Sequence, residues 1–240
     1  MLAEHPTSLG HLPGTTWAFD ESVTHVFDDM LERSIPQYRE MRRLCLDIGS
    51  EFVQPNTDIV DLGCSRGEAL VAFMDRFGAK NRYVGVEVSQ PMIEAARERF
   101  ASWPVSVVKL LDLDLRKDYP TVDASLTLCV LTLMFTPINY RQQIMRRIYD
   151  TTRPGGAVLL VEKLLGESAE TDRVYVDRYH AFKAANGYSN EEIERKRLAL
   201  EGVQVPVTAK WNEDILHAAG FRQVECFWRW LNFAGWVGIK

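Results

Sequence analysis

Short apolar runs alternate with amphipathic stretches through the middle of the chain. The amphipathic stretches carry apolar residues at helical spacing, and the last of them ends at RPGG, which cannot continue a helix. Apolar runs that predict five strands occupy residues 59–62, 82–88, 105–111, 124–131 and 157–164, and predicted helices occupy residues 68–77, 91–100 and 138–152. This alternation is typical of an α/β fold with a doubly wound, mostly parallel sheet.

The two ends of the chain depart from this alternation. Residues 1–16 hold prolines and glycines that predict a loose arm, and residues 21–33 and 37–52 predict helices broken by Pro36. Residues 165–203 predict one long polar helical stretch. The last twenty residues predict two strands with Asn232 near their turn, which would complete a seven-stranded sheet with an antiparallel edge strand. We therefore divide the chain into an N-terminal arm with cap helices (1–52), a core (53–164), a helical arm (165–203) and C-terminal strands (204–240).

Composition narrows the class of protein. Of the 240 residues, 46% are apolar and 25% charged, which is ordinary for a globular chain, and the net charge of −5 argues against a polybasic surface for nucleic acid. The polar start predicts no signal peptide, and the longest apolar run, residues 124–135, is too short to cross a bilayer. Cys45, Cys64, Cys129 and Cys226 are widely spaced without a CxxC motif, so we expect free buried thiols, no metal site and a cytoplasmic protein.

A turn with two glycines follows the first predicted strand. Gly63 and Gly67 enclose Cys64, Ser65 and Arg66, and glycine in such a turn lets the backbone approach a ligand and adopt positive φ. In a doubly wound sheet, ligands bind beyond the carboxyl ends of the strands, where the strand order reverses. The turn lacks both the third glycine of a dinucleotide fingerprint and the GK[ST] of a P-loop. It therefore favours a nucleoside ligand without a pyrophosphate.

Acidic residues stand near the ends of the first three predicted strands. Glu87 ends the second strand, where its carboxylate can accept both hydroxyls of a ribose. Asp114 follows the third strand and can meet an adenine amino group, while Asp61, just before the glycines, can orient the turn or meet a ligand ammonium group. Each feature alone is common, because short glycine turns arise by chance and a strand-end Glu is usually solvated. Together and in this order, they favour S-adenosylmethionine as the cofactor.

Four segments resemble one enzyme family. The segments WAFDESVTHVFDDMLERSIPQY, FVQPNTDIVDLGCSRG, VSQPMI and FKAANGYSNEEIERKRLALEGV resemble the carboxy-S-adenosylmethionine synthase family, which belongs to the class I methyltransferase superfamily. The resemblance runs from about Trp17 to Lys240, and residues 182–203 are its most specific part. It implies a Rossmann-like class I methyltransferase fold. It also implies an enzyme that uses prephenate to convert S-adenosylmethionine into its carboxylated sulfonium, a donor for wobble-uridine modification in tRNA.

The resemblance also assigns roles to individual residues. Tyr38 closes the family's S-[IV]-P-x-Y motif, and Arg197 is the arginine of a KR pair that meets the extra carboxylate. Three positions depart from the family, since Glu87–Val88 replaces an Asp-Asn pair, Val130 replaces the Asn of N-F-T-L-x-F, and the C-terminal segment is richer in tryptophan. Glu87 can still hold a ribose, but Val130 cannot form the hydrogen bond of an asparagine. The residues expected to contact the cofactor are Tyr38, Asp61, Gly63, Cys64, Ser65, Gly67, Glu87, Val88, Asp114, Leu115 and Val130.

Other side chains have both a chemical and a structural interpretation. His180 could be a general base near neutral pH, although a single helical histidine is more often structural. Tyr38 could shape the methyl pocket or only satisfy a backbone group, and Arg197 without the resemblance would belong to an exposed charged helix face. Trp228, Trp230 and Trp236 could cover an aromatic substrate, but we expect those that face the sheet to belong to the core. Arg229 could meet a substrate carboxylate.

Three functions are compatible with these features. The first, which Val88 and Val130 favour, is a methyltransferase that alkylates a small acceptor by in-line transfer and releases S-adenosylhomocysteine. The second is the carboxy-S-adenosylmethionine synthase itself, with Arg197 as a bidentate carboxylate anchor. The third is a non-catalytic cofactor-binding partner subunit. The sequence does not identify the acceptor.

Residues 165–203 also predict self-association. The stretch carries Val174, Val176, Tyr179 and Phe182, whose apolar side chains need cover, and a twofold dimer is the commonest closed arrangement. We therefore expect a homodimer that acts on a small molecule, without direct nucleic acid binding or membrane insertion.

Overall fold

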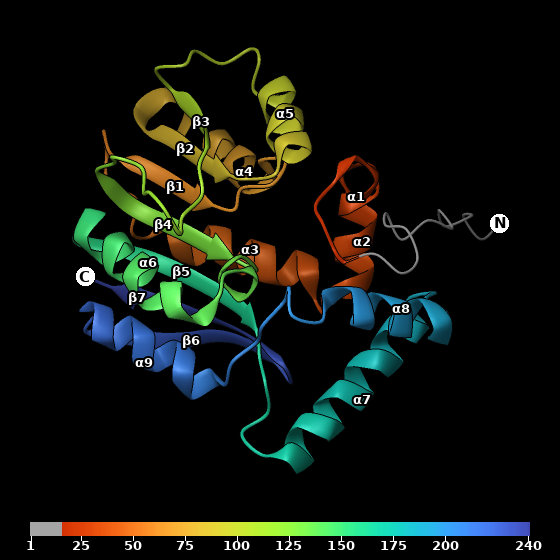
Figure 1. Ribbon diagram of the computed structural model, residues 1–240. Helices are drawn as coiled ribbons and strands as arrows, with labels where there is room; N and C mark the ends of the chain where they lie inside the picture. Colours follow the sequence, from red (N-terminus) through yellow and green to blue (C-terminus); the bar gives the residue numbers. More distant parts are fainter. Residues whose placement is uncertain (1–15) are drawn as a thin grey trace.

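A single seven-stranded sheet organises the chain, and a computed structural model describes it for residues 16–240 (Figure 1). The strands are β1 (Asp58–Leu62), β2 (Arg82–Glu87), β3 (Val108–Asp112), β4 (Ala124–Val130), β5 (Thr152–Lys163), β6 (Gln223–Trp230) and β7 (Phe233–Ile239). Their order across the sheet is β3-β2-β1-β4-β5-β7-β6. All but the last residue of the expected loose arm, residues 1–16, lie outside the described residues.

The direction of the strands confirms the doubly wound sheet and corrects its edge. The first five strands are parallel, whereas β7 runs antiparallel to both β5 and β6. The turn at Leu231 and Asn232 makes β6 and β7 a hairpin, as the position of Asn232 predicted. The antiparallel strand is therefore β7, one place in from the edge, and β6 is the edge strand. Burial agrees with this order, since β7 is buried along nearly its whole length while β6 is largely exposed.

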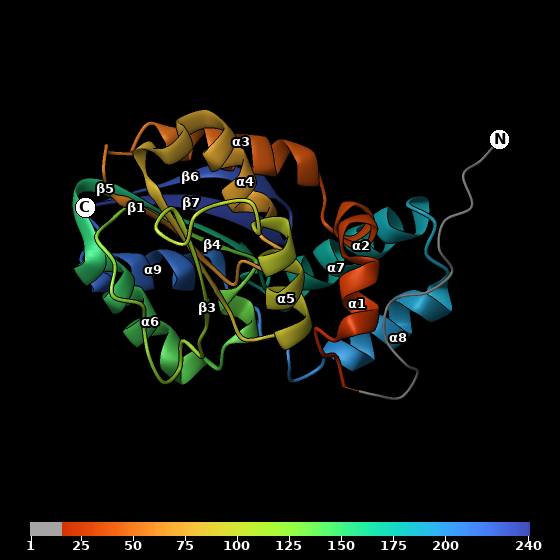
Figure 2. The same cartoon turned by 90° about the horizontal axis from the view of Figure 1, so that it is seen from above.

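Helices cover both faces of the sheet and one of its ends (Figures 1 and 2). Both faces need cover because successive side chains of a strand point to opposite sides, and β1 is buried at every position. In chain order the described helices are α1 (Glu21–His25), α2 (Phe27–Ser34), α3 (Tyr38–Ser50), α4 (Glu68–Phe77), α5 (Gln90–Arg99), α6 (Ile138–Thr151), α7 (Ala169–Ala185), α8 (Asn190–Leu200) and α9 (Ala209–Ala219), with 3-10 turns η1 (Gly78–Lys80) and η2 (Leu133–Phe135).

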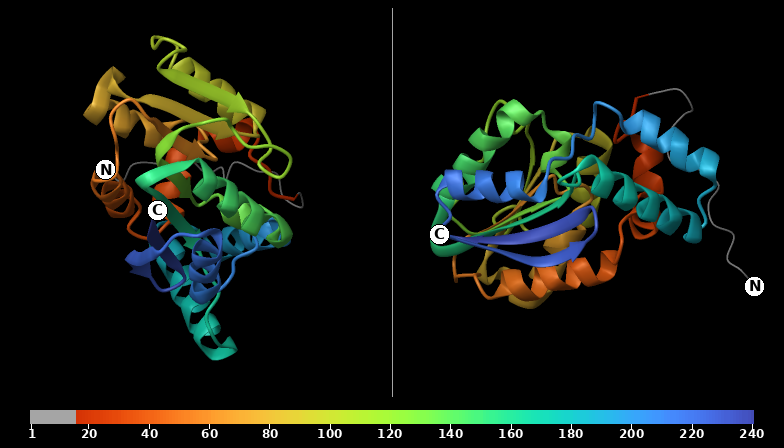
Figure 3. Two further views of the ribbon diagram at one scale, coloured as in Figure 1. Left: turned by 90° about the vertical axis from the view of Figure 1, so that its left-hand side faces the viewer. Right: turned by 90° about the horizontal axis from the view of Figure 1, so that it is seen from below.

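The two faces have separate cores. α3 and α4 pack on the face that presents Ile59 and Leu159, whereas α6 and α9 pack on the face that presents Val60 and Leu160. Figure 2 shows these two helix layers on either side of the sheet, and α5 packs beside β2 and β3. Helices α1, α2 and α8 stand at the end of the sheet where the parallel strands finish, and α7 extends away from the body (Figure 3).

Several predicted boundaries differ from the structure. The stretch 165–203 forms two helices, because Gly187 adopts φ +87° between α7 and α8 and Ser189 caps the second helix with a capping box. The stretch 21–33 is likewise divided, at Val26. Strand β3 begins only at Val108, because the backbone N–H groups of Val107 and Val108 both donate to Pro104 in a turn.

The C-terminal part holds the largest difference. Residues 204–240 were expected to supply only strands, but α9 precedes them, capped by Thr208 and ended by Gly220 in a left-handed conformation. Strand β5 starts at Thr152 and includes RPGG, because Ala124 of β4 pairs with Thr152 and the Gly155 N–H donates to Lys240. Three cysteines are buried and free, but Cys226 is exposed on β6. Within residues 16–240, no helix is long and apolar enough to cross a membrane.

Candidate functional site: a cavity at the switch point of the sheet

The cavity lies where the carboxyl ends of β1, β2 and β4 meet, and residues of α2 and α8 also line it. From β1 the chain winds outward through β2 and β3 on one side and through β4 and β5 on the other, so the cavity sits at the topological switch point. Its volume is about 390 Å³. Sites for small molecules span about 300–1,000 Å³, so this cavity has the size of a ligand site.

The two glycines shape the loop at the floor of the cavity. Gly63 has φ +75° and Gly67, the N-cap of α4, has φ +84°. A Cβ atom would overlap the Thr132 side chain at Gly63 and the Phe100 ring at Gly67, so both positions require glycine for space as well as for conformation. Gly63 and Cys64 line the cavity, whereas Gly67 does not and acts on the loop from behind.

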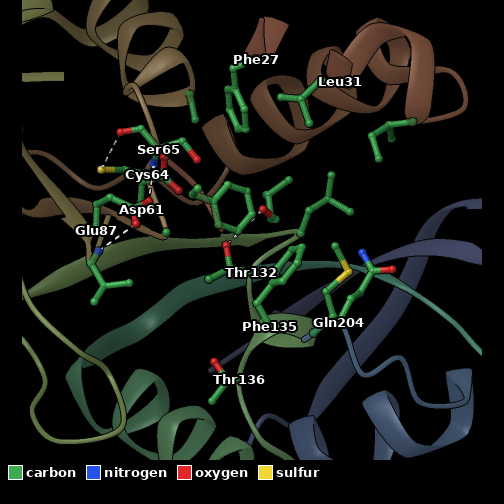
Figure 4. Close-up of a pocket in the computed structure, with 18 of the residues that line it drawn as sticks. Phe27, Leu31, Asp61, Cys64, Ser65, Glu87, Thr132, Phe135, Thr136 and Gln204 are labelled. Carbon is green, nitrogen blue, oxygen red and sulfur yellow. Dashed lines mark hydrogen bonds between the residues drawn. The ribbon is translucent and has the colours of Figure 1, made fainter. Parts of the chain in front are cut away.

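Glu87 fixes this loop through its carboxylate. Its Oε2 accepts from the Ser65 N–H at 3.0 Å, and its Oε1 accepts from the N–H groups of Val88 and Ser89 at 2.8 Å each. Figure 4 shows Glu87, Ser65, Cys64 and Asp61 together on one side of the cavity. The sequence predicted a carboxylate for a ribose at this position. The structure adds a second task, since the same side chain holds the loop after β1 against the end of β2.

Asp61 is a buried acid beside this loop. It is 4% exposed, and its pKa is raised to about 7, chiefly by burial, with Arg42 lowering it and Glu87 and Glu68 contributing to the rise. Arg42 and Glu68 also line the cavity. Three carboxylates around one end of the cavity suit a ligand with positive charge, and such a ligand would lower the pKa of Asp61.

The end of β3 supplies the next wall. Asp114, Leu115 and Arg116 line the cavity, and Arg116 pairs with Asp114 at 2.7 Å, which holds the pKa of that carboxyl below its usual range. Val88, 63% exposed, and Val130 complete this side. The predicted cofactor residues thus converge on one half of the cavity, with Gly67 behind it.

The other half of the cavity is apolar and aromatic. Phe19 and Phe135 meet edge to face with their ring centroids 5.1 Å apart, and Phe27 and Leu31 descend from α2 (Figure 4). The sequence interpretation missed these walls, although the apolar stripe along α2 at three- and four-residue spacing was a signal for them. It also missed polar residues of the lining, among them Arg42, Thr132 and Lys196.

Tyr38 belongs to the cavity, but two other predicted residues lie outside its lining. Burial raises the pKa of Tyr38, so its hydroxyl stays protonated at neutral pH. Arg197 lies on the outer side of α8, where its guanidinium is exposed and pairs with Glu194 at 2.7 Å. His180 is half-buried on α7, and burial followed by the nearby Lys183 lowers its pKa.

The C-terminal tryptophans are structural within this chain. Trp228 and Trp236 are buried, and their indole N–H groups donate to Gln37 at 3.1 Å and to Glu213 at 3.0 Å. Trp230 is half-buried and packs on Phe182. Arg229 is exposed, away from the lining. Across residues 16–240, no group of three or more His, Cys, Asp or Glu side chains is arranged to hold a metal ion.

Known proteins share both the sequence and the fold. Residues 59–156 match the model of a family described as a methyltransferase domain. The chain is 42% identical over 226 residues to a carboxy-S-adenosyl-L-methionine synthase of Methylococcus capsulatus, and 93% of each chain is covered. It is 39% identical over 228 residues to the enzyme of the same name from Wolinella succinogenes, with 92% of each chain covered. This chain belongs to the carboxy-S-adenosyl-L-methionine synthase family.

Members of the carboxy-S-adenosyl-L-methionine synthase family are S-adenosylmethionine-dependent transferases of the class I methyltransferase superfamily, which confirms the predicted enzyme class, fold and cofactor. The human N-acetylserotonin methyltransferase, solved in complex with S-adenosylmethionine, has the same fold, with a TM-score of 0.60 and 18% identity over 92% of this chain and 56% of that one. The chemical groups that line the cavity match those of the cofactor. It offers a glycine floor, a fixed carboxylate at Glu87 and a buried acid at Asp61 for a cationic amino acid group.

Proposed function

We propose that this chain transfers a methyl group from S-adenosylmethionine to a small acceptor held in the apolar half of the cavity. Val130 is the observation that favours methyl transfer over carboxy-S-adenosylmethionine synthesis. It lines the cavity at the end of β4, where the family motif has an asparagine. Valine offers no hydrogen bond to developing charge, and loss of one such preorganised contact costs about 10²–10³-fold in rate. The outward position of Arg197 supports the same choice, since carboxy transfer would use that guanidinium inside the site.

In this proposal the chain's own residues bind, align and dehydrate the reactants. When bound, S-adenosylmethionine would supply an activated methyl group on its sulfonium, and its transfer to the acceptor would release S-adenosylhomocysteine and a proton to water. Glu87 holds the loop and the ribose hydroxyls, and Asp61 faces the cationic end. Tyr38 and Phe135, which both line the cavity, restrict the acceptor to an in-line approach and exclude water. Roles for His180 and Arg197 remain expectations from the sequence.

A second candidate is carboxy-S-adenosylmethionine synthesis from prephenate. It is favoured by the relatives that bear this enzyme's name over more than nine-tenths of their length. It requires a cationic group for the extra carboxylate, and within a single chain Lys196 rather than Arg197 lines the cavity.

One product assay separates the two candidates. The protein is incubated with S-adenosylmethionine and prephenate, and the carboxylated sulfonium is sought by mass spectrometry. We expect little or none from the wild type and restored formation by Val130→Asn. Stoichiometric formation by the wild type would establish the second candidate instead. Binding of S-adenosylhomocysteine without formation of either product would favour the non-catalytic cofactor-binding partner subunit.

The setting of this activity is part of the same proposal. We propose a cytoplasmic homodimer that acts on a small molecule and makes no direct contact with nucleic acid. The free thiols of Cys45 and Cys129 support a reducing compartment, and the net charge of −5 gives no general attraction to phosphate backbones. The dimer is supported by apolar side chains that α7 and α8 leave exposed, among them Val174 and Leu198.

A further inference from the structure

A buried lysine stands in the apolar half of the cavity. Lys196 comes from α8, is 7% exposed and lines the cavity next to Ser34 of α2. Its Nζ donates to the Ser34 hydroxyl at 3.1 Å and lies 5.1 Å from the centre of the Trp17 ring. A lysine side chain is almost never buried without a counter-charge, because removing an ammonium group from water costs several kcal/mol.

Among residues 16–240, the charged groups that shift the pKa of Lys196 are all cations. Lys183 of α7, Lys163 of β5 and Arg33 of α2 all lower its pKa, after burial itself, and bring it to about 7. Among residues 16–240, none of its resolved electrostatic partners is an acid. The carboxylates Asp61, Glu68, Glu87 and Asp114 gather around the cofactor half of the cavity instead. The two halves of the cavity therefore differ in sign, negative at the cofactor end and positive at the acceptor end.

A neighbouring amide adds a donor to the positive half. Lys163 donates to Oε1 of Gln204 at 3.1 Å, and Gln204 lines the cavity opposite the cofactor side (Figure 4). Since a lysine can only donate, this hydrogen bond fixes which amide atom is oxygen. The NH₂ of Gln204 is therefore the group left to donate to a ligand.

We propose that Lys196 binds a carboxylate of the acceptor, so that the substrate is a small organic acid with an apolar body. The inference rests on the proposed function, which places the acceptor in this half. The aromatic walls at Phe27 and Phe135 take the apolar body, and Lys196 supplies the missing counter-charge, with Gln204 donating to the same acid group. The carboxylate in turn satisfies a buried ammonium that has no acidic partner among the residues that the structure describes.

The test compares an acid with its neutral amide. Phenylacetate and phenylacetamide have the same apolar body, and their binding is measured by calorimetry with and without S-adenosylhomocysteine. We expect the acid to bind about 10- to 100-fold more tightly, the range of a charged hydrogen bond. The preference should disappear in Lys196→Met and survive in Lys210→Met, a control at an exposed lysine paired with Asp214. Equal binding of both compounds by the wild type, or an unchanged preference in Lys196→Met, would overturn the inference.

A second readout needs no variant. Because the carboxylate should raise the pKa of Lys196, binding of phenylacetate at pH 7 should take up about half a proton, seen as a dependence of the heat on buffer ionisation. Phenylacetamide should take up none. Absence of uptake with the acid would contradict the role of Lys196 even if a variant failed to fold. Failure of S-adenosylhomocysteine to bind would count against the proposed function alone, since the acid preference is measured without it as well.

Discussion

Asp61 makes cofactor binding depend on pH. With a pKa of about 7 caused by burial, it is largely neutral at pH 6 and largely ionised at pH 8. Because the ionised form attracts a ligand ammonium group, affinity for S-adenosylhomocysteine should rise with pH by up to about tenfold per unit below pH 7. Calorimetry from pH 6 to 8 measures this slope.

The controls assign the slope to one carboxyl group. Asp61→Asn should bind weakly and lose most of the slope. Asp114→Asn should keep it, because the pKa of Asp114 is already held low by Arg116 and this group stays ionised throughout the range. A slope that persists in Asp61→Asn would assign the titration to another group.

Lys196 should lower the stability of the folded chain. Its folded pKa of about 7 lies below the unfolded value, so the folded state binds fewer protons between pH 7 and about 10.5 and the free energy of unfolding rises with pH there. Lys196→Met should raise the free energy of unfolding at pH 6 by about 1–4 kcal/mol, and the gain should shrink by pH 9. Urea denaturation at both pH values, with Lys210→Met as control, tests this. A destabilised Lys196→Met would mean that the Ser34 contact outweighs the buried charge.

The sequence indicated the acidic residues and glycines at this end of the sheet, but not the buried cations or the apolar walls of the cavity. Asp61 and Glu87 lie in the last residues of β1 and β2, and Asp114 follows β3, so parallel packing alone brings them to one edge of the sheet. Lys196 could be found only by noticing that Ile193, Lys196 and Leu200 lie on one helical stripe, which is otherwise apolar. Such a lysine is ordinarily a solvated one, and its burial depends on how α8 packs against α2, which local pattern does not determine.

At the level of elements, the loop after β1 depends on glycine at one crowded position. Gly63→Ala would place a methyl group against Thr132 in a left-handed conformation, so the loop must move. We expect affinity for S-adenosylhomocysteine to fall by at least about tenfold, since a displaced loop breaks the Ser65–Glu87 hydrogen bond, a charged contact worth about 1.5–3 kcal/mol. Calorimetry of the folded variant measures the loss.

Gly78→Ala is the matched control for this change. Gly78 also has positive φ, +59°, but nothing lies within 4 Å of an added Cβ. It should lose about 1 kcal/mol of stability and keep its affinity. If both variants bind equally well, the crowding at Thr132 has no part in the site.

The elements themselves were predicted to the extent that their signals are local. Helix α4 and strand β4 match their predicted ranges within a residue, because a glycine turn or a long apolar run bounds each. Helix α9 was missed although Thr208 and Gly220 mark its ends, because the aromatic strands after it have a stronger apolar pattern than its own stripe. The inner place of β7 depends on which strand of the hairpin is more buried, which is a property of the whole sheet.

At the scale of the whole molecule, α7 and α8 carry apolar side chains that the described residues leave exposed. The chain itself covers two of the four apolar residues that predicted a dimer, since Tyr179 packs on Phe233 at 5.3 Å between ring centroids and Phe182 packs on Trp230 at 5.6 Å. Val174 remains 49% exposed and Leu198 53% exposed, on the helices that extend from the body in Figure 1. Exposed apolar side chains on these two helices make them the candidate interaction surface of the chain.

We expect light scattering to show a dimer at micromolar concentration, with these two helices in the interface. The double variant Val174→Glu with Leu198→Glu should be monomeric, because a closed interface would bury two unpaired carboxylates per chain. Val105→Glu is the control, since Val105 is 81% exposed near the other edge of the sheet and should leave the dimer intact. A wild type that stays monomeric would contradict the dimer itself. A double variant that stays dimeric would place the interface on another part of the surface.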